Sequence, residues 1–274
     1  MQTDRQRDNG HSFLRRDVPL TVSQMRAVAP SLFMAPAPTI RFDTPTGATA
    51  ELIDDLRKAA FDVFEAGQGR SRAEAGREQT RHYLRLRHKS QSGVEDPNEV
   101  VLLGGPVRHA PYSLFAGVCR TVNQNDLVCV TPIRQVRRGA GNDGGPALVA
   151  AARQVMADFP LVDAHKRAMK DLWMSPASQL AFADAARGLL QDTQGACPVS
   201  ALQLLQIVRP EDNAADLWTT LNRVHEHLMR GGLLLREPDG RRYRTRGLVG
   251  VDDSIRLSRA LWRVAEAICE LKLG

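Results

Sequence analysis

The sequence predicts an α+β protein, in which an N-terminal sheet-and-helix half with a β-β-β-α-like order is followed by a mainly helical half with one β-hairpin. Two observations predict this class. Strand-like runs at 61–67, 81–89 and 99–105 precede the glycine-rich run GAGNDGG at 139–145, and stretches with helical periodicity follow it. Glycine clusters favour loops, so GAGNDGG is the expected boundary between the halves.

Four segments are therefore expected along the 274 residues. They are a mobile N-terminal arm (1–17), an α+β domain (18–138), a glycine-rich linker (139–145) and a mainly helical region (146–274) with a hairpin at 233–248. The arm is expected because residues 1–17 are polar, mixed in charge and without apolar periodicity.

The elements of the first half follow from local pattern. A short helix within TVSQMRAVAPSLFM stops near Pro30, because proline disrupts a helix interior. A second helix begins near Thr49, a suitable N-cap residue. The three strand-like runs follow, and then PYSLFAGVCRTV (111–122) predicts a helix with Pro111 at its start. DLVCVTPIRQVRR (126–138) is a further strand candidate.

The second half contains apolar positions at helical spacing. The clearest helix is 213–232, where Leu217, Leu221, Val224 and Leu228 form one seam and Gly231 is a natural stop. LLLREPDGRRYRTRGLV predicts a β-hairpin because a Pro-Asp-Gly turn joins its two strands. The other expected helices are 146–159, 161–174, 176–190, 199–208 and 253–273.

Charge is unevenly distributed. The formal net charge is +6 and the pI about 9.5. Residues 70–89, 134–138 and 230–246 together hold +12, which leaves −6 for the rest of the chain. Clustered cations on an acidic remainder favour a polyanionic partner. The alternative is that these runs are solvated faces and loops.

Residues 80–90, TRHYLRLRHKS, carry the sharpest pattern. Side chains alternate across a strand, so His82, Leu84, Leu86 and His88 are expected on one face. The opposite face would hold Arg81, Tyr83, Arg85, Arg87 and Lys89.

The hairpin repeats this composition. Its second strand places Arg242, Arg244 and Arg246 on one face, with Arg241 and Tyr243 on the other. Cations that follow phosphates and tyrosines that stack on bases are typical of a single-strand binding groove. Arg134, Arg137 and Arg138 form a third, shorter basic run. The alternative for both strands is an antiparallel sheet with one wet face.

Other function classes lack a motif. The sequence has no HExxH or Cys/His cluster, no GxSxG elbow and no phosphate-binding loop, so we expect no metal, no cofactor and no catalytic site. There is no secretory signal and no apolar run of about 20 residues, so no membrane partner is expected. Four scattered cysteines predict reduced thiols in a cytoplasmic protein.

Several blocks resemble the "phage/plasmid-like protein" family, domain of unknown function nine-three-two. The most specific are DLWTTLNRV…RGG (216–232) and GVDDSIRLSRALW (250–262), and the resemblance spans nearly the whole chain after about residue 20. Where members have a Cys-Ser-Asn-Gly-Leu-like run, this chain has NQNDL at 123–127. The resemblance implies an origin on mobile elements, beside genes for DNA transfer and repair, and no catalytic residues.

The expected order of elements from 49 to 122 is also similar to the β-β-β-α core of phage single-strand annealing proteins, which often form rings. The leading hypothesis is a non-enzymatic protein that binds single-stranded DNA in preference to duplex or RNA, with an annealing or recombination role and a homo-oligomeric state. The alternative hypothesis is an interaction protein that counteracts a host defence system by binding a host defence or repair protein. An enzyme with a site assembled from distant residues is a third.

Overall fold

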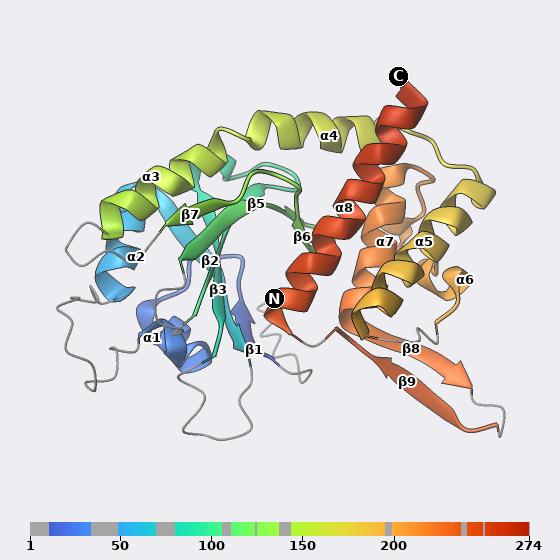
Figure 1. Ribbon diagram of the computed structural model, residues 1–274, viewed down its shortest axis with the longest axis horizontal. Coiled ribbons are helices and arrows are strands. Elements are labelled where there is room, and N and C mark those ends of the chain that lie inside the picture. The colour runs from blue at the N-terminus through green and yellow to red at the C-terminus, as the bar shows by residue number, and fades with distance from the viewer. Residues whose placement is uncertain are drawn as a thin grey trace. The chain divides into compact units, whose positions relative to one another are not determined.

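The computed structural model describes residues 11–33, 49–69, 80–105, 111–123, 125–136, 144–194, 199–236, 240–248 and 250–273. Figure 1 shows its helices and strands. The chain divides into two compact units, Met1–Gly117 with Thr131–Phe159 (unit 1) and Val118–Val130 with Pro160–Gly274 (unit 2). Of the expected linker at 139–145, Gly144 and Gly145 begin a helix and the rest lies outside the described residues.

The main sheet has the strand order β1-β2-β3-β4-β5-β6, and β7 pairs with β5. Its strands are β1 (His11–Arg15), β2 (Phe61–Gly69), β3 (His82–His88), β4 (Asn98–Gly104), β5 (Tyr112–Arg120), β6 (Asn125–Val128) and β7 (Arg134–Val136). Strands β1 to β4 pair antiparallel. The three strand-like runs are thus confirmed, and so is the α+β fold class with its helical second half and hairpin.

Strand β1 lies within the segment that the sequence predicts to be a mobile arm. Phe13 is buried in it, and Leu14 pairs with Ala66 of β2. A run of five residues is too short to show a clear period-2 pattern in the sequence. Only the pairing with the neighbouring strand identifies these residues as a strand. Residues 1–10 of the expected arm lie outside the described residues.

Unit 1 also contains helices. They are α1 (Val22–Val28), α2 (Thr49–Lys58) and α3 (Gly144–Met156), with 3-10 turns η1 (Pro30–Leu32) and η3 (Lys89–Gln91). A capping box between Thr21 and Gln24 begins α1, which ends before Pro30 as expected. Helices α2 and α3 pack against each other and against β2, β4 and β7 (Figure 1). Ile53 and Leu56 of α2 are fully buried.

The helix predicted at 111–122 is wrong, because these residues form strand β5. Leu114 through Cys119 are buried in succession, on both faces of the strand. A run that is apolar on both faces fits a helical apolar stripe as well as a strand, so periodicity alone cannot separate the two. The aromatic and β-branched residues in YSLFAGVCR are the signal that favoured a strand.

Unit 2 is mainly helical. Its elements are α4 (Phe159–Asp171), α5 (Pro176–Gln194), α6 (Ala201–Leu204), η4 (Pro210–Asp212), α7 (Leu217–Arg230), β8 (Gly231–Arg236), β9 (Arg242–Arg246) and α8 (Val251–Leu273). The expected helix at 199–208 is much shorter than predicted. Ser200 caps it through a capping box with Gln203, and it ends at Leu204, ahead of the β-branched pair Ile207 and Val208.

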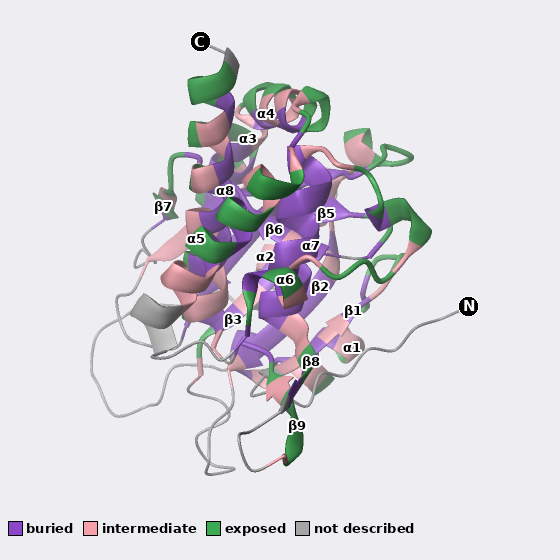
Figure 2. Cartoon of the chain, turned by 90° about the vertical axis from the view of Figure 1, so that its right-hand side faces the viewer, coloured by how far each residue is buried: buried purple, intermediate pink, exposed green. Residues whose placement is uncertain are grey.

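Helix α7 is the centre of unit 2. It packs against α5, α6, α8, β6 and β8, and Figure 2 shows it in the colour of buried residues. Thirteen of its fourteen residues are buried, so its polar side chains must find partners inside the protein. An edge-on contact between Trp218 and Trp262 joins it to α8. The seam predicted from Leu217 to Leu228 is confirmed, but the helix is buried all round.

Candidate nucleic-acid interface

The alternation predicted for β3 is confirmed, but its basic face is not open to solvent. Leu84 pairs with Ala66 and Leu102, whereas Arg85 pairs in register with Glu65 and Val101. Arg85 is 2% exposed. Its Nε donates to Glu99 Oε2 at 2.6 Å, and Arg87 Nη2 donates to Glu99 Oε1 at 2.7 Å. Two of the predicted contact residues are therefore held by a carboxylate of the neighbouring strand.

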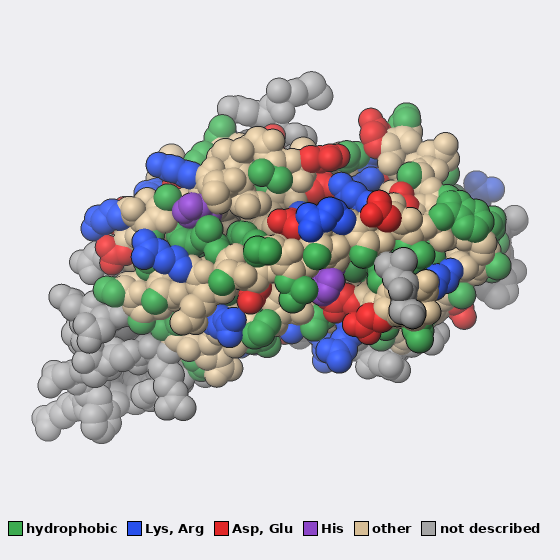
Figure 3. Space-filling model, turned by 90° about the horizontal axis from the view of Figure 1, so that it is seen from above, with side chains coloured by type: hydrophobic (Ala, Val, Ile, Leu, Met, Phe, Trp, Pro, Cys, Tyr) green, Lys and Arg blue, Asp and Glu red, His purple; other side chains and the backbone are tan. Residues whose placement is uncertain are grey.

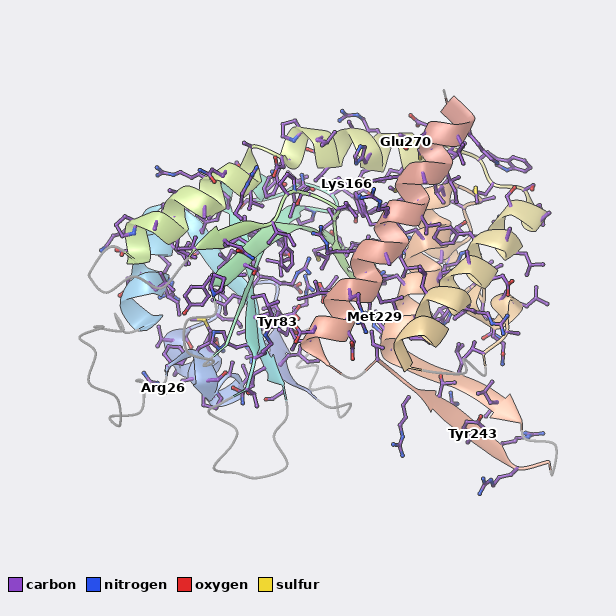
Figure 4. All side chains as sticks on the ribbon, in the orientation of Figure 1. Arg26, Tyr83, Lys166, Met229, Tyr243 and Glu270 are labelled. Carbon is purple, nitrogen blue, oxygen red and sulfur yellow. The ribbon has the colours of Figure 1, made fainter. Side chains whose placement is uncertain are left out.

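The same face carries a second carboxylate. Glu65 of β2 accepts from Arg15 Nη1 at 2.9 Å and from the Tyr83 hydroxyl at 2.6 Å. The hydroxyl of Tyr83 is thus held by Glu65. Figure 4 labels Tyr83, which belongs to β3. Arg87 also stacks over the Phe64 ring, 4.3 Å from its centroid.

Glu99 is the electrostatic centre of this network. Burial by itself would raise the pKa of the carboxyl, but the charges of Arg85, Arg15 and Arg87 outweigh it and lower the pKa from 4.5 to about 2. Glu99 is consequently ionised at any physiological pH. The carboxylates of Glu65 and Glu99 therefore offset most of the positive charge of Arg15, Arg85 and Arg87 on this face of unit 1.

Sequence reasoning missed both carboxylates. Glu65 lies with Asp62 in the run FDVFEAG, and Glu99 is the one acid of the run NEVVLLG. An acid in an otherwise mostly apolar strand beside an arginine-rich strand is the signal that could have identified cross-strand pairs. The remaining residues of the predicted face, Arg81 and Lys89, flank β3 and are exposed.

The third basic run is described only in part. Arg134 lies in β7, and its Nη2 is 3.4 Å from Asp158 Oδ2 with a third of the side chain exposed. Arg137 and Arg138 lie outside the described residues.

The hairpin of β8 and β9 presents its cations differently. Leu234 pairs with Arg244, Leu235 with Tyr243 and Arg236 with Arg242, so the residues of β9 alternate between two faces as predicted. All the arginines of β9 are exposed, and Figure 2 shows this strand in the colour of exposed residues. Arg241, which precedes β9, is exposed as well.

Within the part of the chain that the structure describes, no carboxylate pairs with Arg242, Arg244 or Arg246. Arg244 Nη1 donates to the backbone oxygen of Gly232 at 2.6 Å, and this acceptor is a neutral group. Long side chains with terminal nitrogen atoms project from β9 in Figure 4. We call Arg242, Arg244 and Arg246 the arginine row.

The other face of the hairpin packs. Leu233 and Leu235 are 7% and 8% exposed, and Leu233 N donates to Thr245 Oγ1 at 3.1 Å. Tyr243 shares this face and is 38% exposed.

Glycines join the hairpin closely to α7. Gly231 ends the helix with φ of 62°, a conformation that favours glycine. A Cβ on Gly247 would lie 2.4 Å from the Met229 oxygen, so no larger residue fits without a shift of the backbone. Gln203 Nε2 donates to the Leu234 oxygen at 3.0 Å and ties β8 to the residues of α6.

Ion pairs support the end of α7 beside the hairpin. Glu226 accepts from Arg209 Nη2 at 2.5 Å, and Arg230 is a second guanidinium partner. Asn123 Nδ2 also donates to Glu226, at 2.8 Å. Asp212 pairs with Arg120 at 2.5 Å. These cations are compensated, in contrast to the arginine row.

A buried hydrogen-bonded chain joins β6, α7 and α8. His225 Nδ1 is 2.7 Å from Asn125 Oδ1, and His225 Nε2 is 3.2 Å from Ser258 Oγ. Asn125 Nδ2 donates to Asn222 Oδ1, so it is the Oδ1 of Asn125 that faces His225. Because this amide oxygen can only accept, His225 Nδ1 carries the proton. Asn123 and Asn125 come from the NQNDL run, and they hold α7 in place.

This hydrogen-bonded series places a hydroxyl (Ser258), a base (His225) and an orienting amide (Asn125) in the order used by nucleophilic enzymes. Its side chains lack the solvent access that a substrate would need. Ser258 and His225 are 1% and 2% exposed, and Ser258 Oγ also accepts from Val128 N at 2.7 Å. We interpret it as a structural pin. In the described residues, no group of three or more His, Cys, Asp and Glu side chains could hold a metal ion.

Other surfaces of unit 2 mix their charges. Figure 3 shows acidic and basic side chains side by side over α4 and α8. Lys166 Nζ lies 2.8 Å from Asp163, and His165 Nδ1 lies 2.7 Å from Glu266. Among the described helices, none is long and apolar enough to cross a membrane.

The comparisons with known proteins agree with the resemblance seen in the sequence. The family model described as "Domain of unknown function (DUF932)" matches residues 44–262. The chain is 36% identical over 260 residues to UPF0380 protein YafZ and 35% identical over 260 residues to UPF0380 protein YfjQ, both of Escherichia coli (strain K12). Each alignment covers 94% of both chains. No solved structure matches. The chain therefore belongs to the DUF932 family.

Proposed function

We propose that this protein binds nucleic acid through the β8–β9 hairpin, with single-stranded DNA as the preferred ligand and a role as an accessory of DNA transfer or recombination on a mobile element. The observation that carries the proposal is the arginine row, whose three cations are exposed and have no carboxylate partner in the described residues.

The spacing of the row suits a phosphate backbone. Alternate residues of a strand lie about 7 Å apart, so the row presents a cation at regular steps over about 14 Å. Each arginine that neutralises a phosphate releases counterions, and this release supplies sequence-independent affinity. An exposed arginine that has no carboxylate partner among the described residues should bind a phosphate more favourably than an arginine already held in an ion pair.

The proposal moves the contact surface from β3 to the hairpin. Arg85 and Arg87 already pair with Glu99, so binding a phosphate there would require breaking a buried ion pair. Arg81 and Lys89, exposed at either end of β3, remain proposed as secondary contacts.

The test is fluorescence anisotropy of a labelled single-stranded oligonucleotide, with a matching duplex and RNA beside it, at several salt concentrations. If the row neutralises three phosphates, log affinity should fall with log salt with a slope of roughly −2. In Arg242→Gln/Arg246→Gln the slope should become about −0.7.

The matched control is Arg153→Gln/Arg263→Gln, which removes the same charge from two exposed helical positions and should keep the wild-type slope. Equal losses in both variants would mean that only net charge matters. The absence of binding to any of the three nucleic acids at low salt would overturn the proposal, and an acidic protein surface would replace nucleic acid as the partner.

A further inference from the structure

An exposed leucine lies in the arginine row's face. In β8, Leu233 and Leu235 point into the packed face, and Leu234 between them is 50% exposed. The register pairs Leu234 with Arg244, so the two side chains share the outer face of the hairpin. An apolar side chain therefore lies between exposed cations.

Backbone hydrogen bonds on both sides fix this leucine. Its carbonyl oxygen accepts from Gln203 Nε2 at 3.0 Å, and the preceding residue donates to Thr245 Oγ1 at 3.1 Å. The register shift between Gly231 and Leu234 also gives this part of β8 its own bulged geometry. Leu234 is thus presented from a fixed backbone.

Tyr243 is placed less favourably for base contact. It pairs with Leu235 and lies on the packed face, away from the arginine row. The stacking role that the sequence suggests for Tyr243 is therefore separated from the arginine row by the thickness of the hairpin, and of the exposed basic residues only Arg241, which precedes β9, alternates onto the face of Tyr243 in the described part of the hairpin.

We infer that Leu234 is the base-contacting residue of the hairpin, and that the ligand is a nucleic-acid segment with unstacked bases. This inference rests on the proposed function. Phosphates bind the arginine row, and the apolar plane of an adjacent base covers Leu234. Paired, stacked bases keep their planes covered by one another, so a single strand offers this contact without prior unstacking, whereas a duplex must first open a base step.

A single exposed leucine on a protein surface needs no special explanation. Leu161 on α4 is 52% exposed, and the described residues around it form no row of unpaired arginines. What distinguishes Leu234 is the exposed cation opposite it in register, which holds a polyanion against the leucine.

The experiment uses the full chain and a single-stranded oligonucleotide that contains 2-aminopurine, a base whose fluorescence reports its stacking. Wild-type binding should change this fluorescence. In Leu234→Ala, affinity should fall about fivefold from the lost apolar contact, while the salt slope stays unchanged because no phosphate contact is lost. Leu234→Trp should bind more tightly than wild type, because an aromatic plane stacks better on a base.

Leu161→Ala is the matched control, since it removes the same side chain at the same exposure, and it should bind like wild type. If wild type binds with a steep salt slope but Leu234→Ala keeps its affinity and fluorescence change, this inference fails and the proposed function stands. If wild type itself does not bind, the proposed function has failed. Circular dichroism of each variant verifies that a substitution at these half-exposed positions leaves the fold intact.

Discussion

Arg85 Nε lies 2.6 Å from Glu99 Oε2, and neither side chain is more than 3% exposed. Arg15 and Arg87 lie 3.7 and 2.7 Å from the same carboxylate. A single glutamate therefore lies within ion-pair distance of three guanidinium groups, and Glu65 pairs with one of the three, Arg15. The relationship turns a strand that looks like a binding surface into an internal part of unit 1.

Glu99→Gln should lower the free energy of unfolding by about 3–5 kcal/mol, because it leaves buried cations without their carboxylate. Urea unfolding followed by circular dichroism measures the change. Asp54→Asn is the control, since Asp54 pairs with Arg57 at 3.7 Å on the surface and its loss should stay below about 1 kcal/mol. Equal effects of the two substitutions would contradict the role given to Glu99.

The pKa of Glu99 predicts a pH dependence. The folded-state pKa of about 2 is below the ordinary 4.5, so the unfolded chain binds more protons between these values. The contribution is complete above pH 4.5 and is lost as the pH falls towards 2, and it amounts to about 3 kcal/mol. The difference in unfolding free energy between wild type and Glu99→Gln should therefore shrink from pH 6 to pH 2.5. A constant difference over this range would argue against an ionised Glu99.

The sequence predicts much of this fold because its strongest patterns are local. Alternation in TRHYLRLRH identifies both faces of β3, and the turn residues Pro238, Asp239 and Gly240 identify the hairpin. The helical seam of α7 is equally plain. Each of these signals depends on neighbours within a few residues, which is the range over which a single sequence is informative.

What the sequence does not predict depends on partners far along the chain. Whether Arg85 faces solvent is decided by Glu99 on the next strand, and whether Arg244 does is decided by the lack of an acid opposite it. Both strands are rich in arginine and contain one tyrosine. Only the register, which sets the cross-strand neighbours, separates a neutralised face from an open one.

Ser258→Ala should destabilise the protein by about 2 kcal/mol, because Val128 N and His225 Nε2 each lose a buried partner. Urea unfolding compares it with Ser23→Ala, whose hydroxyl is exposed beside Thr21 and whose loss should change little. A Ser258→Ala protein as stable as wild type would show that the hydroxyl is not a structural pin.

Two glycines should respond oppositely to alanine. Gly247→Ala should cost about 2 kcal/mol or more, because its Cβ would overlap the Met229 oxygen at 2.4 Å and displace the hairpin from α7. Gly188→Ala in α5 has nothing within 4 Å of the new Cβ and should stabilise by about 0.5–1 kcal/mol. Thermal unfolding of the two variants measures both signs, and a neutral Gly247→Ala would contradict the close approach at the root of the hairpin.

The roles of the two arginine-rich strands, β3 and β9, can be distinguished by measuring both the free energy of unfolding and the affinity for DNA. Arg85→Gln/Arg87→Gln removes the two guanidinium groups that lie nearest to the Glu99 carboxylate. The double substitution should lower the free energy of unfolding by about 3–5 kcal/mol. At a temperature where the variant remains folded, its affinity for single-stranded DNA should match wild type, because neither guanidinium is free to bind a phosphate. Arg242→Gln/Arg246→Gln should show the reverse, with a wild-type unfolding curve and a reduced salt slope. A folded Arg85→Gln/Arg87→Gln protein that no longer binds would return the contact surface to β3, because a folded variant that has lost only an internal ion pair should still bind.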